Sequence, residues 1–425
     1  MGMPSSFLVL LASAAVFNVR DYGAAGDGAA KDTAAIQRTV DAAAAAGGGE
    51  VRVPAGHYVS GSVFLRSNVD FHVEEGALLE ASRDPKDYNA ADVCPQNRAS
   101  KAENTSGGHF FLAIEATNVT VRGKGVFDGS GVYFMTNGFD RARVGRTGRN
   151  GLGWVNEQDA ILWRPGQMMY FVECDNLRLE GVTVRNAPYW SVFVHGCTHV
   201  TAKDLTIRSS RDPYVLNGDG LNLDCCRHVT VEGCDISTSD DALCLRTDGQ
   251  RLRRAPPETS DVTVRNCRLS SGQEAIRLGV GEGVVRDCRF SNIAIHDSVR
   301  GINLASTWFP SRGVDFIDIS FTNVTAECRK AFLWLHRLKS REPEVRGITF
   351  TDVRARQGDS SYIWAWKGKP FKDIALRNVD LNGGLEVINV NGFRIEGGTV
   401  KPTPLSEKTL GERNRMLETC TEFIW

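Results

Sequence analysis

The sequence predicts an all-β protein, a right-handed parallel β-helix whose N-terminal end is covered by a helix. Three observations predict this fold. A six-residue strand motif recurs over residues 177–398, its fifth position is always Gly, Asn or Asp, and no amphipathic helix separates the copies. An ordinary α/β protein would place such helices between its strands. We therefore expect the copies to stack in parallel, coil upon coil.

Each copy of the motif has the pattern of a strand that turns a corner. In VTVEGC (229–234) apolar residues alternate with polar ones, which is the period of a strand with one buried face. The fifth residue must bend the chain, and Gly, Asn and Asp tolerate left-handed backbone angles best. The fifth positions are Gly181, Asp204, Gly233, Asn266, Asp287, Asn323, Asp352, Asn378 and Gly397.

Cysteines recur at the sixth position of the motif, which elsewhere holds Val or Leu. Cys234, Cys267 and Cys288 are therefore expected to form one inward column of thiols that pack as small apolar side chains. No CxxC pair and no His/Cys metal spacing accompanies them, so no zinc site is predicted.

The β-helix is expected to form a single domain over residues 17–402, with a different segment at each end. Residues 1–16 carry a short apolar run ending in small residues, which resembles a secretory signal or leader remnant, with a first strand as the alternative. An alanine-rich stretch then predicts a capping helix that begins at Asp32 or Thr33 and stops at three glycines. Residues 403–425 are more polar and predict a C-terminal cap or tail. The leader favours a secreted or periplasmic location, and a cytoplasmic one stays open.

The charge balance excludes two classes of partner. The chain carries 50 Lys and Arg against 51 Asp and Glu, so no polycationic surface for nucleic acid or anionic membrane lipid is expected. No later segment is apolar and long enough to cross a bilayer. A neutral or modestly charged partner is expected, and the oligomeric state is left open.

Superimposing the coils brings acidic residues together. The inward Leu and Ile set the register, so that GDGLNLD (218–224) falls on DDALCLR (240–246) and RGINLA (300–305) falls on EAIRLG (274–279). One outward column then holds Asp219, Asp241, Glu274 and Arg300, and the adjacent column holds Asp240 and Gln273. Because stacked strands lie about 4.8 Å apart, the three aspartates are expected to be neighbours in space.

This crowding has a chemical consequence. Three carboxylates in so small an area repel one another, which a purely structural surface strand would avoid. One of Asp219, Asp240 and Asp241 is therefore expected to have a raised pKa and to hold a proton near neutrality. A protonated acid beside an ionised base is what glycoside hydrolysis requires. A calcium site or a solvated turn is the alternative interpretation.

With these residues the chain resembles the polygalacturonase family, glycoside hydrolase family 28, over most of its length. Residues 17–56 are similar to the family's N-terminal segment, and WRP (163–165) and NAPYW (186–190) to its approach to the active site. NGD (217–219) and SDD (239–241) match its two acidic motifs in type and spacing. The resemblance implies a pectin-lyase-like β-helix that hydrolyses pectic chains with inversion and needs no metal or cofactor.

The same resemblance implies a role for each acidic residue. Asp240 would be the general acid that protonates the leaving oxygen, while Asp219 and Asp241 would together orient and deprotonate water on the opposite face. Asn217, in the NGD motif, would contact the substrate. In an inverting enzyme the acid and the base are roughly 6.5–9.5 Å apart, which leaves room for the water.

The chain departs from the family pattern at two places. Where the family has Gly-His-Gly, residues 272–274 read GQE, and the family's Arg-x-Lys falls on NLA at residues 303–305. An amide can hydrogen-bond but cannot titrate, and Leu and Ala cannot replace a cationic clamp for a sugar carboxylate. We therefore expect a divergent member whose substrate is shifted from plain homogalacturonan.

Further candidate substrate-binding residues surround the acids: Gln273, Glu274, Arg277, Arg300, Asn303, Arg246, Tyr189, Trp190 and Trp308. Arg277 either holds an anionic group or pairs with the neighbouring carboxylates, and Glu274 could accept hydrogen bonds from sugar hydroxyls. Tyr189, Trp190 and Trp308 are predicted to stack on sugar faces, with loop packing as the alternative.

Three rival functions stay open. A polysaccharide lyase or a transglycosylase could use the same fold, and so could a non-catalytic carbohydrate-binding solenoid. A mere binder has no need for a strained carboxylate cluster, and this argues against the third rival.

Overall fold

The computed structural model describes residues 15–89, 106–137, 163–249, 252–305, 313–337 and 343–419. Nearly all of the predicted leader, residues 1–16, therefore lies outside the described part of the chain, and so does Trp308. Within the described ranges, no helix is both long enough and apolar enough to cross a membrane.

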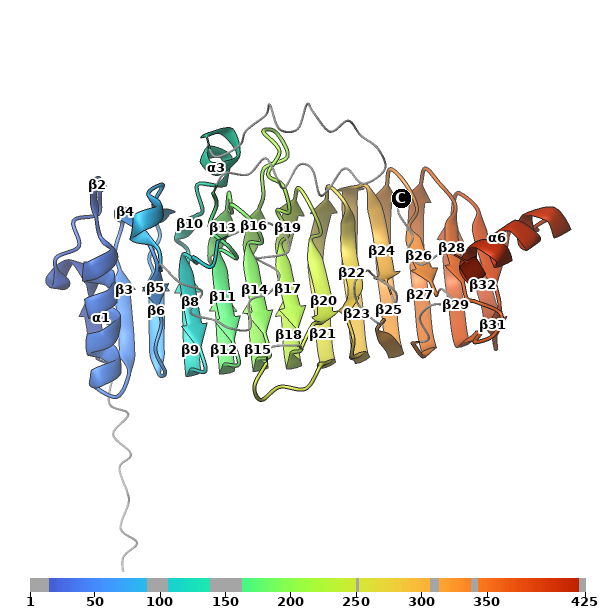
Figure 1. Cartoon of the computed structure of the whole chain (residues 1–425), viewed down its shortest axis with the longest axis horizontal. Coiled ribbons are helices and arrows are strands. Elements are labelled where there is room, and N and C mark those ends of the chain that lie inside the picture. The colour runs from blue at the N-terminus through green and yellow to red at the C-terminus, as the bar shows by residue number, and fades with distance from the viewer. Residues whose placement is uncertain are drawn as a thin grey trace, which may run out of the picture.

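Parallel strands stack along the whole described chain and form a right-handed parallel β-helix (Figure 1). They make two sheets, of 21 and 11 strands. The smaller one, here called the site sheet, contains β5 (Val63–Phe64), β8 (Phe111–Ile114), β11 (Met169–Val172), β14 (Val192–His195), β17 (Leu221–Asp224), β20 (Leu243–Thr247), β22 (Glu274–Gly281), β24 (Arg300–Ala305), β26 (Leu333–His336), β28 (Ser361–Trp364) and β30 (Leu385–Ile388).

The larger sheet forms the remaining wall of the solenoid. Its first half contains β1 (Val16–Asn18), β2 (Asp27–Lys31), β3 (Gly49–Val53), β4 (Gly56–Ser60), β6 (Val69–Val73), β7 (Ala77–Ala81), β9 (Thr117–Gly123), β10 (Val126–Asp128), β12 (Asp175–Glu180) and β13 (Thr183–Arg185). Its second half contains β15 (Thr198–Lys203), β16 (Thr206–Arg208), β18 (Arg227–Glu232), β19 (Asp235–Thr238), β21 (Glu258–Ser271), β23 (Val284–Ser298), β25 (Asp315–Cys328), β27 (Val345–Gln357), β29 (Phe371–Leu381), β31 (Val390–Asn391) and β32 (Arg394–Gly398).

The predicted corners adopt left-handed backbone angles. Positive φ occurs at Gly181, Asp204, Gly233, Asn266, Asp287, Asn323, Asp352, Asn378 and Gly397. Side-chain amides also bond from corner to corner: Asn292 Nδ2 donates to Asn266 Oδ1 at 2.9 Å, and Asn323 Nδ2 donates to Asn292 Oδ1 at 2.8 Å. Asn both tolerates the left-handed angle and supplies this ladder, which explains why it recurs.

One coil of the predicted repeat is out of register. Cys288 pairs with Val262, and Ile293 is the residue that pairs with Cys267. The expected three-membered thiol column is therefore wrong: Cys234 and Cys267 share a column, and Cys288 lies in another. All three thiols are nevertheless buried in the core, as expected of small apolar side chains.

The core fills the inside of the solenoid with stacked side chains from successive coils. Phe290, Phe321 and Phe350 stack in sequence, with ring centroids 4.6 and 4.9 Å apart. Phe290 pairs with Phe321, and Phe321 pairs with Phe350, across neighbouring strands. The inward residues of each coil therefore also fix where its outward residues lie.

Short helices accompany the strands. At the N-terminal end α1 (Thr33–Ala45) buries Ile36 and Val40 against the first coils, and the predicted capping helix is confirmed. The Asp32 carboxylate does not cap α1, since it accepts hydrogen bonds from the amides of Ala25 and Gly26 at 2.7 and 3.2 Å. The other helices are η1 (Val19–Tyr22), η2 (Pro85–Asp87), α3 (Gly131–Asn137) and α6 (Glu407–Thr419).

Helix α6 forms within the segment predicted as a C-terminal cap or tail (Figure 1). Its Leu417 is fully buried in a cluster with Trp334, Trp364 and Ile388, which lie on β26, β28 and β30. The inward residues of those strands, such as Leu335, belong to the main core instead. The helix therefore packs on the outer face of the site sheet.

Candidate active site

The acidic residues gather where the strands of the site sheet begin. Leu221 pairs with Leu243, and Glu274 pairs with Arg300, so the register predicted from the inward residues is confirmed. The amide of Gly220 donates to the carbonyl of Asp241 at 2.9 Å, which seats the coil of Asp219 on that of Asp241. A carboxylate oxygen of each aspartate lies within 4.8 Å of the other and of Cys244 Sγ.

Hydrogen bonds to its backbone carbonyl hold Asp240 in place. Thr238 Oγ1 and Ser271 Oγ donate to its carbonyl at 2.7 and 2.6 Å, and the Asp241 amide donates to its Oδ1 at 3.0 Å. Burial, followed by the negative charges of Asp219, Asp241 and Glu274, raises its pKa well above the usual value of an aspartate. The side chain is 8 % exposed, against 2 % for Asp241. Of the two consecutive aspartates, Asp240 is therefore the one that favours its protonated form.

The pKa of Asp241 is shifted in the opposite direction. Burial would raise its pKa, but the adjacent Arg277 charge and the hydrogen bonds to the carboxylate lower it below the ordinary value. Arg277 Nη1 lies 2.7 Å from Asp241 Oδ2, and the Glu274 amide donates to Oδ1 at 3.2 Å. Two consecutive aspartates thus differ in protonation because Arg277 ion-pairs with only the second.

Asp219 and Glu274 flank this pair. Asn222 Nδ2 donates to Asp219 Oδ2 at 3.3 Å. Glu274 Oε1 accepts from Arg300 Nη1 at 3.1 Å and from Asn303 Nδ2 at 3.2 Å. Burial, with the charge of Asp241 next in size, raises the pKa of Glu274 to about 7. The cluster therefore contains a fourth carboxyl group that titrates near neutrality.

The cations near the site already contact protein carboxylates. Of the two options left open for Arg277, the structure places it on Asp241. Arg300 contacts Glu274, approaches Gln273 Oε1 at 3.5 Å, and lies 4.6 Å from the centroid of the Trp334 ring. The guanidinium groups of Arg277 and Arg300 are therefore both oriented toward carboxylates of the protein.

Three other predicted binding residues lie elsewhere. Arg246 is paired with Asp224 at 3.6 Å and stacks 4.4 Å from the Trp190 ring, so it does not join the acidic cluster. Tyr189 and Trp190 stack on each other in a second cluster and are 0 % and 2 % exposed. The prediction that these two rings are sugar platforms is therefore wrong, because protein groups already pack on them: Arg164 lies 4.7 Å from the centroid of the Tyr189 ring, and Arg246 lies on the Trp190 ring.

A buried arginine positions the turn before Asp219, a role that was not predicted for the WRP motif. Arg164 is fully buried and donates to the carbonyls of Leu216 and Pro188 at 2.6 and 3.2 Å. It also donates to Asn217 Oδ1 at 2.9 Å. The Asn217 amide oxygen, predicted to contact substrate, is therefore engaged in fixing the turn.

Two groups of donors are close enough to share a metal ion within the described residues. They are Asp219 with Asp241 and Cys244, and His195 with Asp224 and Cys225. In each group an arginine sits beside one carboxylate: Arg277 at Asp241 and Arg246 at Asp224. A fixed positive charge at that distance opposes a divalent cation, so neither group is well suited to one.

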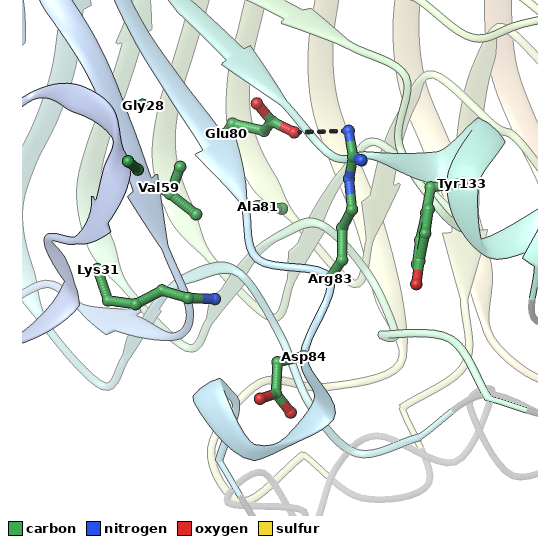
Figure 2. A pocket seen from close by; sticks show the side chains of 9 residues that line it. Gly28, Lys31, Val59, Glu80, Ala81, Arg83, Asp84 and Tyr133 are labelled. Atoms are coloured by element: carbon green, nitrogen blue, oxygen red, sulfur yellow. Dashed lines mark hydrogen bonds and ion pairs between the residues drawn. The ribbon is translucent and has the colours of Figure 1, made fainter.

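A hollow of about 520 Å³ lies at the N-terminal end of the solenoid, away from the acids (Figure 2). It is lined by Lys31, Glu80, Arg83, Asp84 and Tyr133, with small residues between them. Arg83 is paired with Glu80 across it, as the dashed line in Figure 2 shows. None of the predicted site residues borders this hollow.

Comparison with known proteins gives both local and extended matches. A family model described as glycosyl hydrolases family 28 matches residues 51–253. A probable polygalacturonase from Vitis vinifera is 25 % identical over 415 residues, covering 91 % of this chain and 79 % of that protein. Mannuronan C5-epimerase AlgE5 from Azotobacter vinelandii is 65 % identical over 124 residues, which is 27 % of this chain and 12 % of that protein.

The solved structure of a family 28 exopolygalacturonase from Yersinia enterocolitica has the same fold. The TM-score is 0.69 at 19 % identity, covering 93 % of this chain and 80 % of that one. The family model spans both aspartate motifs and ends at residue 253, before Gln273, Glu274 and Asn303. The matched segment thus contains the three aspartates, and the residues that depart from the family pattern lie beyond it.

Proposed function

We propose that the chain is a divergent member of glycosyl hydrolase family 28, and that it hydrolyses a pectin-like polysaccharide or oligosaccharide with inversion. The observation that carries the proposal is the different surroundings of two consecutive aspartates: Arg277 Nη1 lies 2.7 Å from Asp241 Oδ2, whereas Asp240 is buried beside other carboxylates, and this raises its pKa. An inverting glycosidase needs one protonated carboxyl group and one ionised carboxylate on the two sides of the scissile bond.

Asp240 acts as the general acid in this mechanism. Its carboxyl proton passes to the glycosidic oxygen as the bond from that oxygen to the anomeric carbon breaks. Asp219 and Asp241 accept hydrogen bonds from a water on the opposite face of the sugar. One of them takes its proton as the water oxygen bonds to the anomeric carbon, so the configuration inverts. The Arg277 contact supports this division of roles, since it keeps Asp241 ionised.

We also propose that the substrate is shifted from plain homogalacturonan. Arg277 and Arg300 contact Asp241 and Glu274, so binding a sugar carboxylate would compete with two ion pairs of the protein. Asn303 stands where the family has the first cation of its clamp, and its amide suits a hydroxyl group. Neutral or branched pectic oligosaccharides therefore fit the site better than a run of free galacturonates.

A glycan panel with product analysis tests both proposals. Mass spectrometry in ¹⁸O-labelled water separates hydrolysis, which adds one water, from elimination and transglycosylation, which add none. NMR of the first product gives its anomeric configuration. Cleavage of homogalacturonan alone, at a high rate, would refute the substrate shift, and a product without added water would refute the hydrolase.

Asp240→Asn separates an enzyme from a carbohydrate-binding solenoid. Turnover should fall by about 10²–10⁴-fold while glycan binding persists, because the amide keeps the shape but has no proton to give. Asp261→Asn, at an exposed aspartate paired with His228, is the matched control and should leave turnover unchanged. Equal activity of Asp240→Asn and wild type would remove Asp240 from the mechanism.

A polysaccharide substrate occurs outside the cytoplasm, and we therefore propose that the protein is secreted or exported to the periplasm. Cell fractionation of the source organism tests it. Recovery of the full-length protein in the cytoplasm alone would contradict it.

A further inference from the structure

A row of outward side chains continues from the acids along the site sheet. Asn222, Cys244, Arg277 and Asn303 pair in this order across β17, β20, β22 and β24, and we call them the polar row. The next residue in the register is Trp334 on β26. Because Asn222 contacts Asp219, Arg277 contacts Asp241, and Asn303 contacts Glu274, the polar row lies directly beside the acidic cluster.

Unmet hydrogen-bonding groups lie along this row and on its neighbour Trp334. Asn222 Oδ1, Asn303 Oδ1 and Trp334 Nε1 are buried and have no hydrogen-bond partner among the described residues. Their side chains are 0 %, 3 % and 7 % exposed. An unpaired buried polar group costs free energy, and such groups in a native protein are usually satisfied by a ligand or a water. Two acceptors and one donor at intervals suit the hydroxyl groups of a sugar chain.

The N-terminal side of the row is closed by apolar packing. Phe193, which pairs with Asn222, stacks on Tyr170 with centroids 5.2 Å apart in a buried cluster against which Leu252 packs. The chain just after Leu252 is tied down, because the amides of residues 253, 254 and 255 all donate to Glu173 Oε1 at 2.5–3.1 Å. Within the described part of the chain, a sugar chain therefore finds no open surface on this side of Asn222.

The C-terminal side is closed by helix α6. Leu417 packs on Trp334 and Trp364 and is itself fully buried. Arg413 of α6 lies 4.7 Å from the centroid of the Trp364 ring and 3.5 Å from a carboxylate oxygen of Glu386. Glu386 is the row position on β30, two strands beyond Trp334. The helix thus covers the strands onto which a longer groove would continue.

We propose that the polar row is a short substrate-binding row that takes a chain end or a short oligosaccharide, closed by residues 252–255 on one side and by α6 on the other. This inference rests on the proposed function and adds the size of the substrate to it. Four strands at about 4.8 Å spacing span roughly 14 Å. That length accommodates only a few sugars, so units beyond the row make no contact with it.

Binding of defined oligomers to Asp240→Asn tests the row separately from catalysis. The probes are linear oligogalacturonides and branched pectic oligosaccharides of roughly two to eight units, followed by calorimetry. Kd should fall by about tenfold per added sugar until the row is filled and then stay constant. A Kd that keeps falling up to the longest oligomer would overturn the inference, and so would the absence of binding at every length.

Wild-type product analysis then shows whether the two proposals fail together. A plateau in Kd without hydrolysis by wild type would support the row and refute the proposed hydrolase. Hydrolysis at random along long chains would support the hydrolase and overturn the short row. Release of short products from chain ends supports both.

Two variants test the closure of the row by α6 and the role of the unpaired indole N–H of Trp334. Leu417→Ser should loosen α6 and let Kd keep falling beyond the wild-type plateau, whereas Glu412→Ala, at an exposed position of the same helix, should keep the wild-type profile. Trp334→Phe removes only the indole N–H and part of the ring, so it should weaken oligomer binding several-fold without changing the plateau length. Should Leu417→Ser fail to fold, the Trp334→Phe titration still decides, because unchanged affinity would overturn the row.

Discussion

Replacing Arg277 by Gln is expected to change both stability and the pH dependence of activity. Arg277 Nη1 lies 2.7 Å from Asp241 Oδ2, and the two side chains are 13 % and 3 % exposed. Removing one partner of a buried ion pair leaves an uncompensated charge and costs about 3–5 kcal/mol of unfolding free energy. Because natural domains have only about 5–15 kcal/mol in total, the loss should be plain in urea denaturation.

The pH effect follows from the sign of the Asp241 shift. The folded-state pKa of Asp241 lies below the ordinary value of 3.8. The ionised carboxylate therefore contributes stability above pH 3.8, and this contribution is lost as the pH falls through the folded-state pKa. Arg277→Gln removes the charge that lowers this pKa, while burial still raises it. The acidic limb of the activity profile should therefore move to higher pH, and activity should recover as the pH is raised.

Two controls make this result decisive. Arg277→Lys keeps the positive charge and should shift the acidic limb less than Arg277→Gln does. Arg265→Gln breaks an exposed pair with Glu232 and should alter neither stability nor the profile measurably. A folded Arg277→Gln protein with an unmoved acidic limb would refute the assignment of Asp241 as an essential ionised carboxylate.

Three further outcomes are expected. Asp240→Asn, besides lowering turnover as stated above, should raise the melting temperature near neutral pH, because the amide removes a carboxyl group crowded by three others; a lower melting temperature would contradict the repulsion. The folded-state pKa of Glu274 is raised to about 7, so the unfolding free energy should fall as the pH rises from about 4.5 to 7. Glu274→Gln should remove this contribution to the decline, and urea denaturation at both ends of the pH range measures it. Asn292→Val should cost about 1–2 kcal/mol at a φ of 54°, and Asn292→Gly should cost less, as thermal unfolding will show.

The register of the site could be predicted from sequence because the inward side chains of each coil repeat faithfully. Leu221 and Leu243 sit at matching positions, and this alone places Asp219 beside Asp241. The predicted register of the coil that contains Cys288 was wrong because this coil has two left-handed corners five residues apart, Asp287 and Asn292. Either corner satisfies the motif. A local pattern cannot choose between them without the neighbouring strand.

What covers an outward residue could not be predicted in the same way. Strand alternation shows that Arg246 leaves the core, but it does not show that Arg246 stacks on Trp190. Arg164 was missed because its partner Asn217 lies far along the chain, so no local spacing reveals the contact. The ion pair of Arg277 with Asp241 was one of two predicted options, and only side-chain geometry distinguishes them.

The polar row has a modular construction, since each coil adds a single residue to it. Duplicating the coil that carries Asn303 would lengthen the row by one strand spacing while leaving the three aspartates on their own coils. The number of coils would then set the chain length that such an enzyme prefers, and the chemistry of bond cleavage would stay the same.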